Sequence, residues 1–189
     1  LNGTGNKPVR TVLSRMGFKD VTVVPSQENP DGHFPTCPYP NPEIRQAFEE
    51  AIKLAEEIGG DLLLATDPDC DRVGIAVNDG GEYKLMTGNE VGVMLSQYLL
   101  SCRKEQGTLP KDPAIIKTIV TTNLIEKVAK DYNCKIYNLL TGFKYIGELV
   151  TELESNGEAD NFVLGMEESY GYLTGIHARD KDAVNGASL

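Results

Sequence analysis

The stretch that decides the fold is residues 61–77, with the sequence DLLLATDPDCDRVGIAV. Residues 61–66 contain an apolar run between polar residues, which is the pattern of a strand buried on both faces. Residues 67–72 are polar and predict a loop, and residues 73–77 predict a second apolar strand. Because open α/β sheets receive ligands in loops at the carboxyl ends of their strands, this loop is the first candidate for a site.

Helical and strand-like patterns alternate through the rest of the chain. This alternation predicts an α/β fold of two consecutive three-layer α/β/α units with mixed, largely parallel sheets. Chain-breaking residues gather at Gly107, Pro110 and Pro113, so we expect domains at 1–108 and 109–189, the second truncated at its C-terminus. The remaining expected elements are helices at 7–16, 42–58, 89–104, 124–132 and 143–153, strands at 21–24, 115–120, 135–138 and 161–164, and a hairpin at 79–84.

The bulk composition excludes several classes of protein. The chain has 189 residues and a formal net charge of −10, which disfavours a nucleic-acid binder because such proteins need a basic face. No apolar run approaches the roughly 20 residues that cross a bilayer, and the N-terminus lacks the apolar region of a signal peptide. The cysteines are widely spaced and form no CxxC pair, which favours free thiols and a cytoplasmic location; they are Cys37, Cys70, Cys102 and Cys134.

The loop at 67–72 carries carboxylates at alternate positions. Asp67, Asp69 and Asp71 can turn towards one point if the loop curls, and their mutual repulsion then requires a cation. Oxygen ligands alone suit a hard divalent ion, Mg²⁺ above all, with coordination positions left for a phosphate. Arg72 follows directly, and its planar guanidinium could hold that phosphate by two hydrogen bonds.

Other sites share this pattern. The simplest alternative is a solvent-exposed acidic turn that binds no ligand. An EF-hand loop is rejected, because Arg72 and Asn78 stand where it needs glycine and glutamate. An aspartate-nucleophile phosphotransferase or phosphatase also places Asp-x-Asp after a strand, and it remains an alternative.

A second polar loop, GMEESYGY at residues 165–172, also follows a predicted strand. Its acids and hydroxyl can exchange hydrogen bonds with adjacent sugar hydroxyls, and its glycines let the backbone approach a ligand. Alone it could be a polar turn. Beside a metal and phosphate loop, a phosphosugar site is the better interpretation. Further along, basic residues at 177–181 could meet phosphate or form surface ion pairs, and Thr141-Gly142-Phe143-Lys144 opens a helix whose N-terminus could face an anion.

With both loops in place, the sequence resembles the α-D-phosphohexomutase superfamily, and within it the phosphoglucomutase/phosphomannomutase and phosphoglucomutase–phosphopentomutase branches. The resemblance rests on segments that occur in family order over nearly the whole chain: LNGTG at 1–5, PDG at 30–32, PNPE at 40–43, DPDCDR at 67–72, TGFK at 141–144, GMEESYGY at 165–172 and RDKD at 179–182. Asn2 and Cys70 depart from the family pattern, where histidine and a small residue are common.

The resemblance implies a Mg²⁺-dependent phosphosugar mutase, of which this chain is the second and third domain. It assigns Asp67, Asp69 and Asp71 to the metal, Arg72 to the phosphate, and Lys181 to the substrate's surroundings. It assigns Glu167 and Ser169 to the sugar hydroxyls, and Thr141, Gly142 and Lys144 to substrate binding.

The implied substrate is a glucose, mannose or pentose phosphate, converted between its 1-phosphate and its 6- or 5-phosphate through a phosphoserine and a bisphosphate intermediate. The Ser-His-Asn-Pro segment of the family is absent from these residues, so we expect the chain to be inactive alone and to need the remaining domains of its parent. A non-catalytic module that binds a sugar phosphate or a metal is a further alternative.

Overall fold

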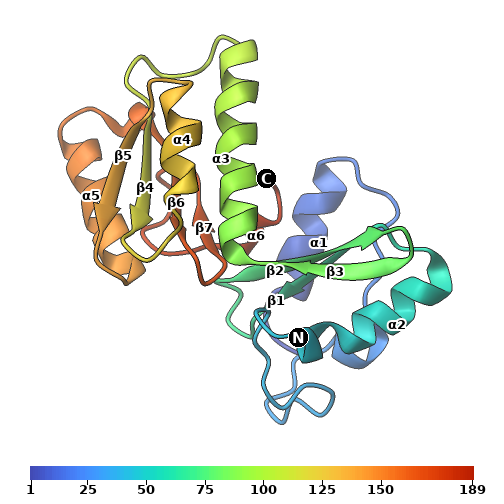
Figure 1. The fold of residues 1–189 in the computed structure, drawn as a ribbon. Helices are drawn as coiled ribbons and strands as arrows, with labels where there is room; N and C mark the ends of the chain where they lie inside the picture. Colours follow the sequence, from blue (N-terminus) through green and yellow to red (C-terminus); the bar gives the residue numbers. More distant parts are fainter. The chain divides into compact units, whose positions relative to one another are not determined.

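A computed structural model describes residues 1–189, which form two compact units (Figure 1). The first unit comprises Leu1–Thr87 together with Ala183–Leu189, and the second comprises Gly88–Asp182. Both contain a sheet and helices, so the predicted fold class is confirmed. No helix combines the length and the apolar character that a membrane span requires.

The sheet of the first unit is antiparallel and has the order β1-β2-β3. The strands span Leu62–Thr66, Val73–Asp79 and Glu82–Met86, in agreement with the predicted strands and hairpin. Thr66 pairs with Val73, so residues 67–72 form the loop that closes the β1–β2 hairpin. The expectation of largely parallel pairing does not hold here, because consecutive strands joined by short loops can only pair antiparallel.

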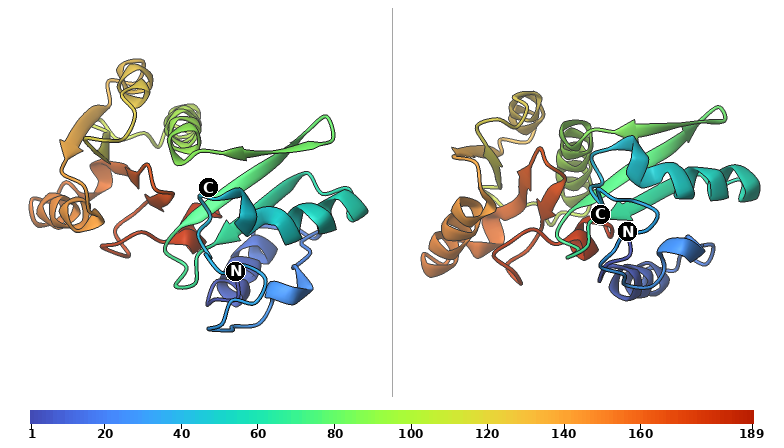
Figure 2. Two further views of the ribbon diagram at one scale, coloured as in Figure 1. Left: turned by 60° about the horizontal axis from the view of Figure 1, so that its bottom comes forward. Right: turned by 90° about the horizontal axis from the view of Figure 1, so that it is seen from below.

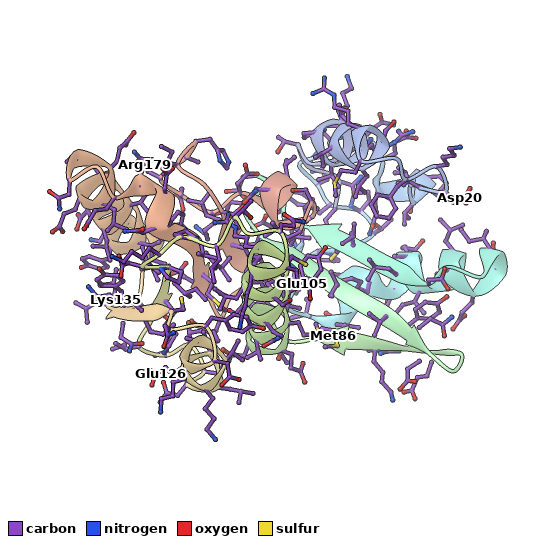
Figure 3. The ribbon with its side chains drawn as sticks, turned by 90° about the horizontal axis from the view of Figure 1, so that it is seen from above. Asp20, Met86, Glu105, Glu126, Lys135 and Arg179 are labelled. Atoms are coloured by element: carbon purple, nitrogen blue, oxygen red, sulfur yellow. The ribbon has the colours of Figure 1, made fainter.

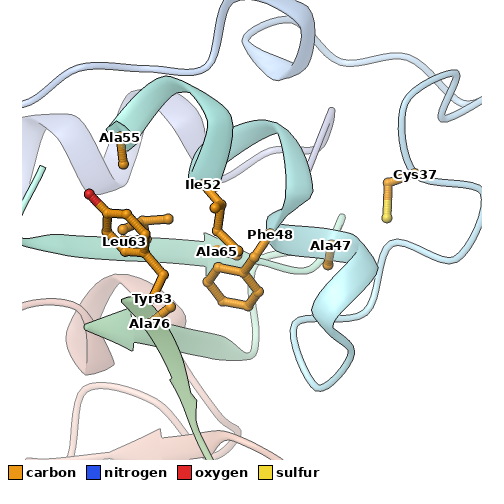
Figure 4. Packing of buried hydrophobic residues seen from close by; sticks show 9 residues of the cluster. All are labelled: Cys37, Ala47, Phe48, Ile52, Ala55, Leu63, Ala65, Ala76 and Tyr83. Carbon is orange, nitrogen blue, oxygen red and sulfur yellow. The ribbon is translucent and has the colours of Figure 1, made fainter. Parts of the chain in front are cut away.

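The core of the first unit lies between helix α2 and the sheet (Figure 4). Helix α2 spans Glu49–Ile58, follows a 3-10 helix η2 at Arg45–Phe48, and ends at Gly59, whose φ of 74° is readily adopted by glycine. Phe48 and Ile52 pack against the β1 residue Leu63 and its neighbours. The unit also contains α1 at Asn6–Arg15, a 3-10 helix η1 at Pro25–Gln27, and α6 at Ala183–Gly186, which packs against α1.

Two expectations about the first unit are wrong. Residues 21–24 form no strand, although they are β-branched, because no neighbouring strand pairs with them and the chain turns at Pro25. The α-helix expected from residue 42 begins only at Glu49. Instead of capping a helix, the side chains of Asn41 and Glu43 bind Arg72.

The second unit has a mixed sheet of order β5-β4-β6-β7. β4 pairs in parallel with β5 and β6, and β7 pairs antiparallel with β6. Helices α3 and α4 cover one face and α5 covers the other, which gives three layers (Figures 1 and 2). The strands are β4 at Ala114–Thr118, β5 at Lys135–Leu139, β6 at Phe162–Glu167 and β7 at Gly171–Leu173, and the helices are α3 at Gly88–Glu105, α4 at Leu124–Lys130, α5 at Phe143–Ser155 and the 3-10 helix η3 at Ala159–Asn161.

Helix α3 packs within the second unit, so the units divide after Thr87, whereas the sequence suggested a boundary after residue 108. Two glycines one turn apart explain this packing. A side-chain carbon on Gly88 would lie 1.9 Å from the carbonyl oxygen of Glu168, and one on Gly92 would lie 2.0 Å from the methyl carbon of Met166. The breaker-rich segment around Pro110 is therefore a connection between α3 and β4.

Candidate functional site

The acidic loop of the first unit is fixed by hydrogen bonds of its own backbone. The amide of Asp67 donates to the carbonyl of Arg72 over 3.3 Å, and the amide of Cys70 donates to the carbonyl of Asp67 over 3.2 Å. Cys70 adopts a φ of 63°, a left-handed conformation that is uncommon outside glycine. From outside the loop, Thr4 donates to the carbonyl of Pro68 over 2.8 Å and Ala183 donates to that of Cys70 over 3.2 Å. The loop is thus held in a curled shape.

This shape brings the three predicted carboxylates together. One oxygen from each of Asp67, Asp69 and Asp71 lies within 4.8 Å of the others. Asp67 is buried, Asp71 is partly buried, and Asp69 is exposed. A cluster of carboxylate oxygens of this size, open on the side of Asp69, fits a hard divalent cation that keeps other ligands on its exposed side.

Arg72 lies beside the carboxylates and is bound by acidic side chains. Its Nε donates to Oδ2 of Asp67 over 2.8 Å, and its Nη1 donates to Oε1 of Glu43 over 3.1 Å and to Oδ1 of Asn41 over 3.4 Å. Partial burial opposes the charged form, but the hydrogen bond and charge of Asp67, with the charges of Glu43 and Asp71, raise the pKa of Arg72 above its ordinary value. Arg72 is therefore a fixed cation at the edge of the carboxylate cluster.

A pocket of about 550 Å³ lies beside Arg72 in the first unit. Its other walls come from the Pro-rich segment before η2 and from the acidic loop. They are formed by Tyr39, Pro40, Asn41, Ile44 and Pro68. Space next to a fixed guanidinium could receive an anionic group.

In the second unit, the side chain of Glu167 contacts the N-terminus of α5. This residue ends β6, and its Oε1 accepts a hydrogen bond from the amide of Gly142 over 2.9 Å. Gly142 has a φ of 114°, which glycine adopts without a steric penalty. Burial raises the pKa of Glu167, as do the charges of Glu168 and Asp180, while the Gly142 hydrogen bond and the charge of Lys181 oppose this shift.

Lys181, whose charge opposes the rise in the pKa of Glu167, packs over a glycine. A side-chain carbon on Gly171 would lie 2.3 Å from Cδ of Lys181, so a larger residue there would require this lysine to move. Its ammonium lies 5.8 Å from the centre of the Phe143 ring and 3.1 Å from Oδ1 of Asp180. The segment that carries Lys181 is tied to α5 by Arg179, which is labelled in Figure 3. The Nε of Arg179 donates to Thr151 over 2.8 Å, and its guanidinium also pairs with Glu154.

The other predicted substrate-binding residues are placed less tightly. Thr141 and Lys144 are exposed next to Gly142, and the Lys144 ammonium lies 4.8 Å from the centre of the Tyr145 ring. Ser169 is partly buried in the loop between β6 and β7. The structure therefore groups Gly142, Glu167 and Lys181, with Thr141, Lys144 and Ser169 on the flanking loops.

The sequence reasoning missed several polar residues behind these sites. Asn41 and Glu43 lie at the start of the helix expected over residues 42–58, and their separation from Arg72 along the chain gives no sign of the contacts that they make with it. Thr118 and Thr121 received no role, yet both donate to the carboxylate of Glu168. The position of Thr118 at the carboxyl end of a predicted parallel strand is the only signal that could have pointed to it.

Comparison with known proteins shows the family to which the chain belongs. Residues 1–81 match phosphoglucomutase/phosphomannomutase alpha/beta/alpha domain II, and residues 87–189 match alpha/beta/alpha domain III of the same family. The chain belongs to the phosphoglucomutase/phosphomannomutase family. Both candidate loops thus lie in segments that match consecutive domains of one family.

Relatives within this family cover all or nearly all of the chain. A phosphomannomutase of Mycoplasmoides pirum is 33% identical over 188 residues, which is 100% of this chain and 33% of that protein. A phosphoglucomutase of Staphylococcus aureus is 36% identical over 185 residues, 97% of this chain and 32% of that protein. The chain thus spans about a third of the length of these relatives.

Solved structures of the phosphoglucomutase/phosphomannomutase family share the fold. A family protein from Burkholderia thailandensis aligns with a TM-score of 0.74 at 17% identity, covering 98% of this chain and 36% of that one. Parafusin, a phosphoglucomutase from Paramecium, aligns with a TM-score of 0.59 at 20% identity, covering 86% of this chain and 26% of that one.

Proposed function

We propose that this chain supplies the metal-binding and sugar-binding parts of a Mg²⁺-dependent phosphosugar mutase. The reaction would interconvert a sugar 1-phosphate and its 6-phosphate, or 5-phosphate for a pentose, through a phosphoserine and a bisphosphate intermediate. The observation that carries this proposal is the cluster of three carboxylates beside a fixed arginine, in a chain that belongs to the phosphoglucomutase/phosphomannomutase family.

The first unit would bind the phosphoryl group that is transferred. Asp67, Asp69 and Asp71 would hold Mg²⁺, which when bound offsets negative charge on a phosphoryl group. Arg72 would donate hydrogen bonds to the same group from the side of the pocket. Its bonds to Asp67 and Glu43 fix the guanidinium before any ligand arrives, which limits the entropy lost on binding.

The second unit would orient the sugar. Glu167 would accept hydrogen bonds from sugar hydroxyls, and Ser169 would both accept and donate. Lys181 would place a positive charge beside Glu167, and Thr141, Gly142 and Lys144 would face the ligand from the N-terminus of α5. Recognition through hydroxyls suits a mutase, because the sugar must be held in two orientations that present similar hydroxyl groups.

Turnover would also require a phosphoserine. No Ser-His-Asn-Pro segment occurs in these 189 residues, which span about a third of the length of the relatives. We therefore expect the chain alone to bind Mg²⁺ and sugar phosphate without converting glucose 1-phosphate to glucose 6-phosphate.

The aspartate-nucleophile alternative makes a different prediction at Asp67. The Oδ1 of Asp67 accepts hydrogen bonds from the amides of Asp71 and Arg72, and its Oδ2 accepts one from the Arg72 side chain. A metal ligand and a nucleophile could both keep these bonds, because a carboxylate has about four lone-pair sites. Trapping a phosphoaspartate at Asp67 would favour the nucleophile over the mutase.

A chimera tests the proposal directly. The 189 residues would replace the matching segment of the Staphylococcus aureus phosphoglucomutase, and conversion of glucose 1-phosphate to glucose 6-phosphate would be measured with Mg²⁺. We expect turnover that falls at least about a hundredfold in the Asp69→Asn and Ser169→Ala variants. Asp20→Asn, which changes another exposed aspartate, is the matched control and should keep full activity.

A chimera that folds and yet converts neither glucose, mannose nor pentose phosphates would contradict the proposal. So would robust turnover by the 189-residue chain on its own.

A further inference from the structure

Glu168 stands between the two residues proposed to bind sugar, but its contacts lie elsewhere. Its Oε2 accepts a hydrogen bond from Thr118 over 3.0 Å and from Thr121 over 3.2 Å. The two hydroxyl oxygens are 2.8 Å apart, and both threonines are almost fully buried, at 0% and 2% exposure. One carboxylate oxygen and two buried hydroxyls therefore lie within hydrogen-bonding distance of one another, and the two hydroxyl protons are shared among these three contacts.

The turn that carries these threonines is itself held in place. Thr121 donates its amide to the carbonyl of Thr118 over 3.1 Å, which closes the turn after β4. Lys117, whose side chain is fully buried, donates to the carbonyl of Thr121 over 3.1 Å and to Oδ1 of Asn123 over 3.2 Å. A buried ammonium is retained only where its donors find acceptors, so this turn is a fixed anchor for Glu168.

The backbone of Glu168 is fixed as well. A side-chain carbon on Gly88 would lie 1.9 Å from the carbonyl oxygen of Glu168 and 3.0 Å from the amide nitrogen of Tyr170. The first residue of α3 therefore lies directly against the loop. Both the side chain and the main chain of Glu168 are restrained from the side of β4 and α3.

Glu167 points to different partners. Its carboxylate accepts a hydrogen bond from the amide of Gly142 at the start of α5 and is influenced by the charge of Lys181. Glu168 instead binds the turn after β4. Glu168 is the first residue of the turn that follows β6, so anchoring it restrains the end of the strand that carries Glu167.

We propose that Glu168 is a positioning residue, which through Thr118 and Thr121 holds the loop so that Glu167 and Ser169 are oriented for the ligand's hydroxyls. This role rests on the proposed function of the loop. It predicts that hydroxyl groups without contact to the ligand control the affinity for a sugar phosphate.

The test removes the two hydroxyls and keeps the side-chain shape. In the 189-residue chain, the double variant Thr118→Val/Thr121→Val should bind glucose 1-phosphate about tenfold more weakly, measured by titration with NMR detection. Thr118→Ser/Thr121→Ser restores the hydroxyls and should recover most of the affinity. The amide signals of Glu167, Ser169 and Gly171 should shift in the valine variant and return in the serine variant.

Glu168→Gln and Glu168→Leu give a second route if the valine variant does not fold, since Glu168 is only partly buried. Glutamine keeps an oxygen acceptor for the threonines and should retain most of the binding, whereas leucine should lose it. If the leucine variant melts at a lower temperature but binds glucose 1-phosphate as the unaltered chain does, Glu168 serves stability alone and the proposal is overturned. Loss of binding in the glutamine variant would also overturn it, because a direct contact with the ligand would then explain the role of the charge.

Two further variants separate this inference from the proposed function. If Glu167→Gln and Ser169→Ala weaken binding but the Thr118, Thr121 and Glu168 variants do not, only the positioning role is overturned. If none of these variants changes the affinity, or if the unaltered chain binds no glucose 1-phosphate, the proposed function of this loop is overturned together with the inference.

Discussion

At the scale of residues, Glu167 shows how burial sets the charge of a candidate ligand-binding group. Burial and neighbouring acids raise its pKa, whereas Gly142 and Lys181 favour its ionised form. A carboxylate whose pKa is higher in the folded chain than in the unfolded chain binds protons more tightly when folded. Its ionisation therefore costs stability as the pH rises through the folded-state pKa, and no such cost exists below the unfolded-state value.

Glu167→Gln should consequently stabilise the chain at neutral pH and have little effect under acidic conditions. Glutamine can keep the hydrogen bond from Gly142 but carries no charge to desolvate. Urea unfolding at pH 4 and pH 7 checks this, with Glu148→Gln, an exposed position on α5, as the matched control. A gain in stability that is the same at both pH values would contradict the assignment to ionisation.

Gly3 supports the acidic loop at close range. A side-chain carbon there would lie 2.3 Å from the carbonyl oxygen of Pro68, and this backbone atom cannot move without displacing the neighbouring aspartates. Gly3→Ala should lower the free energy of unfolding by about 2 kcal/mol and weaken Mg²⁺ binding. Calorimetric titration with Mg²⁺ measures the second effect. Gly32→Ala, with no atom within 4 Å of the added carbon, should change neither quantity.

Spacing along the chain predicted which residues come together within one loop. The alternate aspartates at 67, 69 and 71 do converge, because a six-residue loop between paired strands leaves few other arrangements. Contacts across the fold were not predictable in this way. The bonds from Arg72 to Asn41 and Glu43 join residues about 30 positions apart, and nothing in either segment alone indicates them.

At the scale of elements, the approach of α3 to β6 depends on Gly92. A side-chain carbon at this position would meet the methyl carbon of Met166 at 2.0 Å, although alanine is the better helix former. Gly92→Ala should therefore lower the free energy of unfolding by about 1–3 kcal/mol, since the overlap outweighs the gain in helix propensity.

The double variant Gly92→Ala/Met166→Ala checks that the two residues interact. It should lose less stability than the sum of the two single variants, because the alanine methyl group at position 92 occupies part of the space that Met166 leaves. Chemical unfolding of the four proteins gives the interaction energy. Strict additivity would mean that α3 does not pack on β6 through this pair.

Strong local sequence patterns predicted where strands could form. The presence of a neighbouring strand to pair with decided which of them did form. The apolar runs that became β1, β2 and β4 formed strands because neighbouring strands were available to complete their hydrogen bonds. Residues 21–24 have an equally strand-like composition but no partner, and they form none. Residues 171–173 became β7 by pairing with β6, although their short, glycine-containing sequence gave no strand signal.

At the scale of the whole molecule, the chain divides its proposed chemistry between its two units. The carboxylate cluster and Arg72 belong to the first unit, and the loop with Glu167 and Ser169 belongs to the second. The sequence assigned the two loops to different domains, and they do lie in different units. The sequence suggested a boundary after residue 108, whereas the units divide after Thr87. The chain breakers Gly107 and Pro110 can be recognised in the sequence, but the packing of α3 on β6 cannot.

If the division is correct, each ligand should stabilise a different unit. A ligand that binds only the folded state adds about 2.7 kcal/mol at a concentration a hundredfold above its Kd. Mg²⁺ should then slow hydrogen exchange at the amides of β1 and β2, whereas glucose 1-phosphate should slow it at β4 and β6. Asp69→Asn should abolish the first effect and leave the second, and Ser169→Ala should do the reverse. Equal protection of both sheets by Mg²⁺ alone would contradict the proposed metal site, since the three clustered carboxylates all lie in the first unit.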